Sequence, residues 1–370
     1  MATIEVRAGD DLQVALNDAS VGDTLRVHFG TFIHASQQRA GVPAGEMCVF
    51  NVPHSGLTLQ AYGDGTPLLT YDPANPPWQT INSCYGAVLW WPRSIQNITI
   101  DGFEIVGMNA LGSVVPVAEN LCLGTEGDPG ATIVRNCILR DGNFGIVDSG
   151  TGALYELNQI YNMGAANPDS RLHGIYADGA NQTIRYNYIH HCTGYGIHGY
   201  SAPANLSIYA NTVVHNGGGL LVTGDGHRLI NNTIAWNDGG GIVANDGNRI
   251  GLIGYSTNTV VENNNLWGNG KQTGSRNYGD VQWDSTFSSA TWRKNCYNTI
   301  GNSGSSQTSY DPSDKRDDPQ FFVATPQSFY DFRIPQSSSC WHTGLAQSAP
   351  YNVGLDGRKS SGWPPALLAW

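Results

Sequence analysis

The sequence has few charged side chains and no block of one sign. Charged residues make up 13% of the 370 residues, and 19 Lys and Arg against 30 Asp and Glu give a net charge of −11. Because no run of Lys or Arg occurs, the composition argues against a nucleic-acid-binding or anionic-membrane surface. A hydrophobic share of 40% argues equally against an intrinsically disordered chain.

Long apolar runs and closely spaced cysteine pairs are also missing. No apolar stretch reaches the ~20 residues that a membrane-spanning helix needs, so no membrane partner is expected. None of the seven cysteines forms a Cys-x-x-Cys pair, which argues against a zinc ribbon, and their odd number leaves at least one free thiol. Cys137 and Cys192 lie among apolar residues, where cysteine usually packs as a small hydrophobe.

Glycine is abundant, with 46 residues, and short apolar segments recur between turn residues. The first repeated pattern is Asn, any residue, aliphatic, at intervals of about two dozen residues. It begins at Asn136, Asn158, Asn187, Asn211, Asn232 and Asn264. We expect these six asparagines to stack in an inward column, with their side-chain amides bonded to one another and their backbone left-handed.

A second pattern, mostly a Gly-Ile dipeptide, follows each Asn segment. It occurs at Gly145-Ile146, Gly174-Ile175, Gly196-Ile197, Leu220-Leu221 and Gly241-Ile242. One such coil cannot bury its own aliphatic residues, but a stack of coils forms a continuous core. The sequence therefore predicts an all-β protein, a single-stranded parallel β-helix.

We expect one domain over residues 1–370, divided into an N-terminal cap (1–35), coils (36–300) and a C-terminal coil and tail (301–370). Residues 10–19 should form a short helix that covers the open end of the solenoid, with Asp10 or Asp11 as its N-cap.

These repeats resemble the pectate-lyase-like superfamily of right-handed parallel β-helices over most of residues 20–350. The segment from Arg171 to Ile175, with the Asn-rich coil after it, is also similar to the catalytic modules of alginate epimerases. The resemblance implies a right-handed solenoid that acts on a polysaccharide. It also implies a secreted or periplasmic, monomeric protein whose signal peptide is not in this sequence.

The alternation of side chains along a strand predicts which residues face outward in adjacent coils. One outward column should contain Val147, Tyr176, His198, Val222 and Val243, and a second Ser149, Asp178 and Tyr200. Tyr176, Asp178, His198 and Tyr200 should therefore cluster. An insertion before Gly174 brings Asp169, Arg171 and His173 to the same face.

These residue types suit the removal of the C5 proton of a uronic acid. Tyr176 and His198 would share proton transfer, His173 would support them, and Arg171 would pair with the substrate carboxylate. Asp178 would orient His198 or hold Ca²⁺, the one candidate cofactor. Loss of the C4 leaving group would make the protein a lyase, and return of the proton to the other face an epimerase.

Further residues are predicted to bind substrate: Tyr200, Asp169, His191, Trp236 and Trp267. We place His191 in one column with Arg140, Asn162, His215 and Trp236. This column reads as a solvated or stacking array, and a metal site at His191 and His215 is a minor alternative.

Two other functions stay open. An inverting glycosidase needs two carboxylates about 6.5–9.5 Å apart, for which Asp148 and Asp178 are candidates, although alternation points Asp148 inward or to the strand end. A carbohydrate-binding or phage-fibre solenoid would use the aromatic residues for stacking alone, and Tyr176 and Tyr200 would then have no chemical role.

Overall fold

The computed structural model describes residues 1–35, 37–38, 40–41, 47–72, 74, 85–107, 119–125, 130–165, 172–200, 203–238, 242–244, 256–270, 279–283, 291–297, 311–321, 337–338 and 340. The chain forms two compact units, one of residues 1–182 with 192–194, the other of residues 183–191 with 195–370. The prediction of a single domain stays a prediction. The predicted site residues Asp169 and Arg171 lie outside the described residues, as does most of the predicted C-terminal coil and tail.

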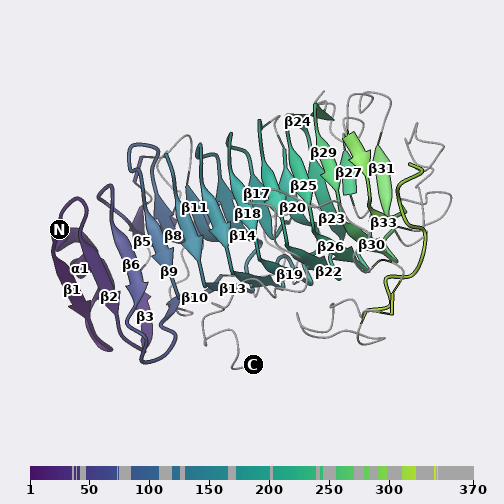
Figure 1. The fold of residues 1–370 in the computed structure, drawn as a ribbon. Helices are drawn as coiled ribbons and strands as arrows, with labels where there is room; N and C mark the ends of the chain where they lie inside the picture. The colour runs from purple at the N-terminus through teal and green to yellow at the C-terminus, as the bar shows by residue number, and fades with distance from the viewer. Residues whose placement is uncertain are drawn as a thin grey trace. The chain divides into compact units, whose positions relative to one another are not determined.

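Near the start of the first unit, between its first two strands in the chain, is the predicted capping helix, α1 (Leu12–Asp18), which lies beside the first strands (Figure 1). Its N-cap is Asp11, whose carboxylate accepts the backbone N–H groups of Gln13 and Val14 and so supplies acceptors at the helix start. Leu12 and Leu16 are fully buried on its inner face. Within the described ranges α1 is the only helix, and no helix there is long and apolar enough to cross a bilayer.

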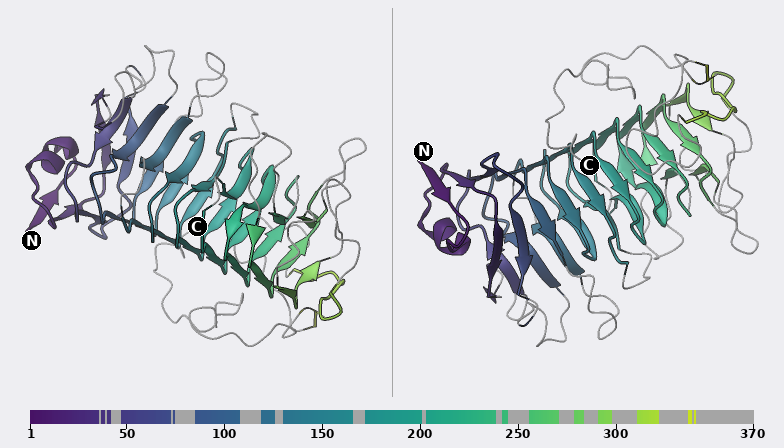
Figure 2. Two further views of the ribbon diagram at one scale, coloured as in Figure 1. Left: turned by 90° about the horizontal axis from the view of Figure 1, so that it is seen from above. Right: turned by 90° about the horizontal axis from the view of Figure 1, so that it is seen from below.

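Three sheets of parallel strands follow the cap, with one strand of each sheet in a typical coil (Figure 2). Sheet A contains β1 (Thr3–Val6), β2 (Thr24–Val27), β6 (Thr58–Ala61), β9 (Thr99–Asp101), β12 (Ile133–Arg135) and β15 (Leu154–Glu156). Sheet B contains β3 (Thr31–His34), β7 (Leu68–Tyr71), β10 (Glu104–Val106), β13 (Ile138–Arg140) and β16 (Gln159–Tyr161). Sheet C contains β5 (Met47–Asn51), β8 (Tyr85–Trp91), β11 (Glu119–Thr125), β14 (Phe144–Asp148) and β17 (Ile175–Ala177), with the short antiparallel β4 (Gln37–Gln38) at its edge.

The core of this unit consists of apolar side chains stacked in register. In sheet A, Leu59 pairs with Ile100, Ile100 with Val134, and Val134 with Tyr155, and all four are fully buried. Burying such a side chain contributes about 1.5–3 kcal/mol. Cys137 and Cys192 are buried outside any disulfide, in agreement with their predicted packing as small apolar side chains.

The second unit repeats the three-sheet arrangement. Its sheet A contains β18 (Thr183–Arg185), β21 (Ser207–Tyr209), β25 (Arg228–Ile230), β29 (Val260–Glu262) and β32 (Thr291–Arg293). Its sheet B contains β19 (Tyr188–His190), β22 (Thr212–Val214), β26 (Thr233–Ala235), β30 (Asn265–Trp267) and β33 (Cys296–Tyr297). Its sheet C contains β20 (Tyr195–Gly199), β23 (Gly218–Val222), β27 (Ile242–Ala244) and β31 (Val281–Trp283), and β24 (Gly224–Asp225) pairs separately with β28 (Ser256–Thr257).

Two ladders of buried asparagines hold the tight turns of the second unit together. In each ladder an Asn Oδ1 accepts both the backbone N–H and the Nδ2–H of the preceding Asn, at 2.8–3.1 Å. The first ladder runs through Asn187, Asn211, Asn232, Asn264 and Asn295 to Asp314, and the second through Asn216, Asn237 and Asn269 to Asp280. Both ladders therefore end on a carboxylate, which can only accept.

Two details of the predicted Asn column are wrong. The ladder position of the coil near residue 137 is Cys137, whose N–H donates to Asn158 Oδ1, and Asn136 precedes it. The left-handed residue is also the one before each rung, with φ between 54° and 59° at Asn136, Leu157, Tyr186, Ala210 and Asn231. The ladder hydrogen bonds offset the cost of this conformation, which is about 1–2 kcal/mol for residues such as leucine.

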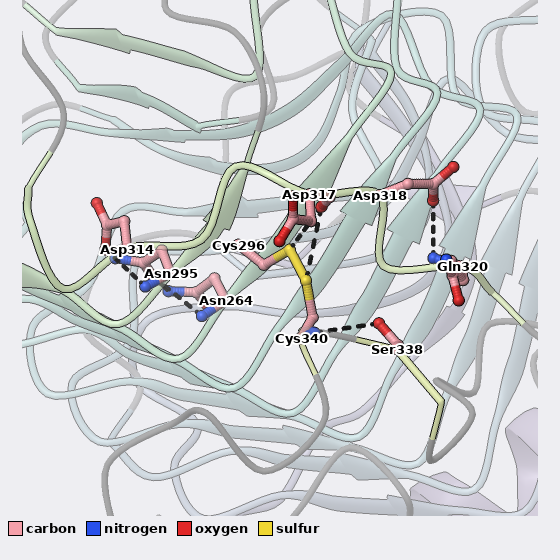
Figure 3. The surroundings of a disulfide bond; sticks show 9 residues. All are labelled: Asn264, Asn295, Cys296, Asp314, Asp317, Asp318, Gln320, Ser338 and Cys340. Carbon is pink, nitrogen blue, oxygen red and sulfur yellow. Dashed lines mark hydrogen bonds between the residues drawn. A yellow bond between two sulfur atoms is a disulfide. The ribbon is translucent and has the colours of Figure 1, made fainter.

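The end of the first ladder lies next to a disulfide between Cys296 and Cys340, a pairing that the sequence left open (Figure 3). Asp314 accepts the backbone N–H of Asn295 at 2.8 Å and the indole N–H of Trp292 at 2.8 Å. Hydrogen bonds thus join the tail segment 311–321 to the last described coil, and the Cys296–Cys340 disulfide lies close to them.

At the N-terminal cap, His28 bridges two carboxylates. Its Nδ1 lies 2.8 Å from Asp64 and its Nε2 3.0 Å from Glu5, and its ring stacks on Tyr62. The hydrogen bond to Asp64 raises the pKa of His28 above its ordinary value, and the bond to Glu5 adds to this against the opposing effect of burial.

We predict that Asn232→Ala lowers the free energy of unfolding by about 2–3 kcal/mol, because it removes the acceptor of the buried Asn211 backbone N–H and the side-chain donor to the Ile208 carbonyl. Urea denaturation measures the change. Asp18→Ala, at the exposed last residue of α1, is the control and should change stability far less. Equal effects of the two variants would contradict the structural role of the ladder.

We also predict that His28→Ala destabilises the protein at low pH and much less at high pH. A pKa that is raised in the folded state means that the stabilisation is complete below about pH 6.5 and is lost as the pH rises through the folded-state value. Thermal melting of both proteins between pH 5 and 9 tests this. A melting-temperature difference that stays constant with pH would show that the carboxylate pairing does not contribute.

Candidate functional site

The outward column of sheet C holds the residues predicted to act on substrate. In the first unit the register pairs Val147 with Tyr176, as predicted. In the second unit it pairs His198 with Leu221, so the predicted position of Val222 in this column is wrong. The reason is that Gly219-Leu220, rather than Leu220-Leu221, takes the place of the Gly-Ile dipeptide, and Val222 pairs with Gly199.

In the first unit, His173 and Tyr176 form a group of rings with Phe144. The His173 and Tyr176 rings are stacked with centroids 6.0 Å apart, and Phe144 meets His173 edge-on at 5.6 Å. His173 is only 3% exposed, whereas Tyr176 is half-buried. Tyr176 and Val147 pack against a buried cluster that includes Phe144, so this face is firmly held and largely apolar.

The two aspartates of the glycosidase alternative have different environments. Asp148 is fully buried, accepts the Tyr155 hydroxyl and the Gly150 N–H, and so points inward as predicted. Burial raises the pKa of Tyr155 well above its ordinary value, and the Asp148 carboxylate adds to the effect. Asp178 is half-buried, and its backbone N–H donates to the Asp148 carbonyl at 3.1 Å. Asp148 therefore has the environment of a structural carboxylate.

In the second unit, His198 is flanked by two tyrosine rings of the same segment. Its ring stacks with Tyr195 at 5.5 Å and 14°, and with Tyr200 at 5.0 Å and 17°. His198 is 6% exposed, and this burial lowers its pKa to about 3. The imidazole is consequently neutral at physiological pH. Protonation would place a charge in a buried position, where it is poorly solvated.

Tyr176 and Asp178 belong to the first unit, and His198 and Tyr200 to the second. Each group has the ring-rich setting described above within its own unit. The gathering of all four into one site, with Arg171 and Asp169, stays a prediction.

The predicted column at His191 forms a stack of rings at the turn between sheets B and C. His191 stacks with His215 at 5.5 Å, and His215 with Trp236 at 5.6 Å. Arg140 was wrongly assigned to this position, because its strand pairing with Tyr161 places it one residue earlier, and Asp141 has the left-handed backbone that His191 and His215 share.

Two more side chains adjoin this stack. Phe321 of the tail packs against Trp236, and Trp267 packs beside it over Val214 and Ala235. His190 and His191 share a hydrogen bond between their Nδ1 atoms at 2.7 Å. Among the described residues, no three His, Cys, Asp or Glu side chains are placed to hold a metal ion together. The substrate-binding role of His191, Trp236 and Trp267 stays a prediction.

Sequence reasoning missed two aromatic neighbours, Phe144 and Tyr195. A readable signal was present: in three coils the residue before Gly-Ile is a ring, namely Phe144, His173 and Tyr195. The second Asn ladder was missed too, although its first three members follow first-ladder members by a constant interval, as in Asn211 and Asn216.

Comparisons with known proteins agree with this fold. Residues 121–296 match the family model of the right-handed beta helix region, and no curated protein matches the sequence. The structure is similar to pectate lyase Pel9A, with a TM-score of 0.64 and 13% identity over 94% of this chain and 93% of that one.

Two further similar structures represent other activities. The A-module of the mannuronan C-5 epimerase AlgE6 from Azotobacter vinelandii has a TM-score of 0.53 and 14% identity over 85% of this chain and 87% of the module. A mutant tailspike protein of E. coli bacteriophage HK620, in complex with a pentasaccharide, has a TM-score of 0.55 and 14% identity over 80% of this chain and 54% of the tailspike. The chain therefore has the right-handed parallel β-helix fold, as predicted, and this fold is similar to those of a pectate lyase, an epimerase module and a tailspike protein.

We predict that His198 does not titrate between pH 5 and 8, because burial lowers its pKa to about 3. NMR of protein labelled at the histidine ring carbons would follow the histidines, and the spectrum of His198→Gln would assign the signal. His28, whose pKa the hydrogen bond to Asp64 raises, is the titrating reference. A His198 signal that moves with a midpoint near 6.5 would contradict the buried, stacked environment.

Proposed function

We propose that the protein is a polysaccharide lyase that cleaves a uronic-acid-containing polysaccharide by β-elimination. The observation that carries the proposal is the His198 ring stacked between Tyr195 and Tyr200 in the outward column of sheet C. Imidazole and phenol groups are among the side chains that transfer protons in enzyme active sites.

The proposed reaction removes the C5 proton of the uronate and breaks the C4–O bond. The electron pair of the C5–H bond forms the C4=C5 double bond, and the leaving oxygen takes a proton. His198 accepts the proton and Tyr176 donates one, while His173 supports Tyr176 through ring stacking and Tyr200 supports His198. Arg171 pairs with the uronate carboxylate.

Asp178 is proposed to orient His198 or to hold Ca²⁺, whose ligands are oxygen atoms. Substrate binding is assigned to Tyr200, Asp169, His191, Trp236 and Trp267. Because the substrate is a polymer found outside cells, we propose secretion or export to the periplasm, and action as a monomer.

The same groups would serve an epimerase if a proton returned to the opposite face of C5, and the likeness to an epimerase module supports this as the second candidate. The hydrolase alternative is weaker, because Asp148 is buried and bonded to Tyr155 and so does not pair with Asp178 across a groove. The likeness to a tailspike protein keeps a binding role as a further alternative.

We predict that ultraviolet absorbance rises when the protein is incubated with one member of a panel of alginate, pectin and glycosaminoglycans, with or without Ca²⁺. His198→Ala and Tyr176→Phe should each lower the rate by about 10²–10⁴-fold, because each removes a proton-transfer group. His34→Ala, at the N-terminal cap, is the matched control and should retain full activity.

Three other results would overturn the lyase. New reducing ends without absorbance would indicate hydrolysis. Exchange of the C5 proton with solvent, without chain cleavage, would indicate epimerisation. Retention on a polysaccharide column without any reaction would indicate a binding protein.

A further inference from the structure

The inner side of sheet C in the first unit carries a group of buried polar side chains. Trp91 and Thr125 are direct neighbours in the register of β8 and β11. Trp91 is fully buried and Thr125 is 3% exposed. One coil further, the pairing of Gly124 with Val147 brings Thr125 beside Asp148, which is also fully buried.

Several polar atoms of this group find no hydrogen-bond partner among the described residues. They are the indole nitrogen Nε1 of Trp91, the hydroxyl Oγ1 of Thr125 and the amide oxygen Oε1 of Gln182. Gln182 belongs to the same group, because its Nε2 donates to the carbonyls of Asp148 and Gly150 at 3.1 and 2.9 Å. An unmet buried polar atom costs about 1–3 kcal/mol, so three in one place need an explanation.

Their chemistry identifies what would satisfy them. An indole N–H needs an acceptor, an amide oxygen needs a donor, and a hydroxyl can use either. A cation cannot accept from an indole N–H, whereas a water molecule both accepts and donates and typically makes about three hydrogen bonds in a buried site.

We infer that ordered water is bound inside the solenoid, bridging Trp91 and Thr125 and extending toward the Asp148–Gln182 pair. The strand that contains Asp148 also places Val147 beside Tyr176 on the outer face. The internal water therefore supports the strands beneath the proposed substrate-binding face, independently of whether the protein is a lyase.

The first test is the sign of a stability change. With water present, Thr125→Val removes a partner of that water, and the melting temperature should fall by about 2–4 °C. With no water, the same change deletes an unmet hydroxyl and the melting temperature should rise. Thr223→Val is the matched control, because the buried Thr223 hydroxyl donates to the Gly199 carbonyl at 3.3 Å and its loss should lower the melting temperature.

The second test is a crystal structure at a resolution that shows ordered water. A density peak about 2.7–3.2 Å from both Trp91 Nε1 and Thr125 Oγ1 would support the inference. A rise in melting temperature for Thr125→Val, an empty region of density, or an ion with several oxygen ligands at about 2.3–2.6 Å would overturn it.

Discussion

The structure depends on one constraint: the polar groups buried at the turns of each coil need hydrogen-bond partners, and the adjacent coil supplies most of them. Donors and acceptors at these turns therefore repeat in register along the stack. The Asn ladders meet this constraint, since each amide serves the backbone of the preceding coil and the amide of the preceding rung. The left-handed turns, the strand register and the two terminal aspartates, Asp280 and Asp314, all follow from this repetition.

This repetition is also why the sequence predicts the fold well. Stacked residues recur in the chain at the interval of a coil, and the Asn rungs from Asn158 to Asn264 and the inward Ile146, Ile175 and Ile197 are readable without coordinates. The errors were shifts of one residue, at Asn136, Arg140 and Val222. At two of these sites the repeated position is occupied by a different residue type. Cys137 lies where the ladder has Asn, and Leu220 lies where other coils have Ile.

The candidate site is harder to derive because outward positions obey no such repetition. Val147 and Tyr176 occupy equivalent places in the register, although one is aliphatic and the other aromatic, so one residue does not predict the other. Alternation predicts that His198 faces outward, but not that Tyr195 and Tyr200 stack on its ring or that burial lowers its pKa to about 3. A ring before the Gly-Ile dipeptide recurs in three coils, but the stacking of two tyrosines on one imidazole depends on side-chain packing within a single segment.

The separation of inward and outward columns explains how a fold can persist while function changes. Inward residues are constrained to size and hydrophobicity, so 13% identity to a pectate lyase is compatible with the same solenoid. Outward residues are not held to this constraint on size and hydrophobicity. Here they include uncharged rings on a protein with a net charge of −11. A polyanionic chain would be repelled by that overall charge, so its binding needs local cation pairing of the kind assigned to Arg171. On this scaffold a lyase that acts on uronates would thus need a local cation beside its substrate, whereas a hydrolase of a neutral sugar would not.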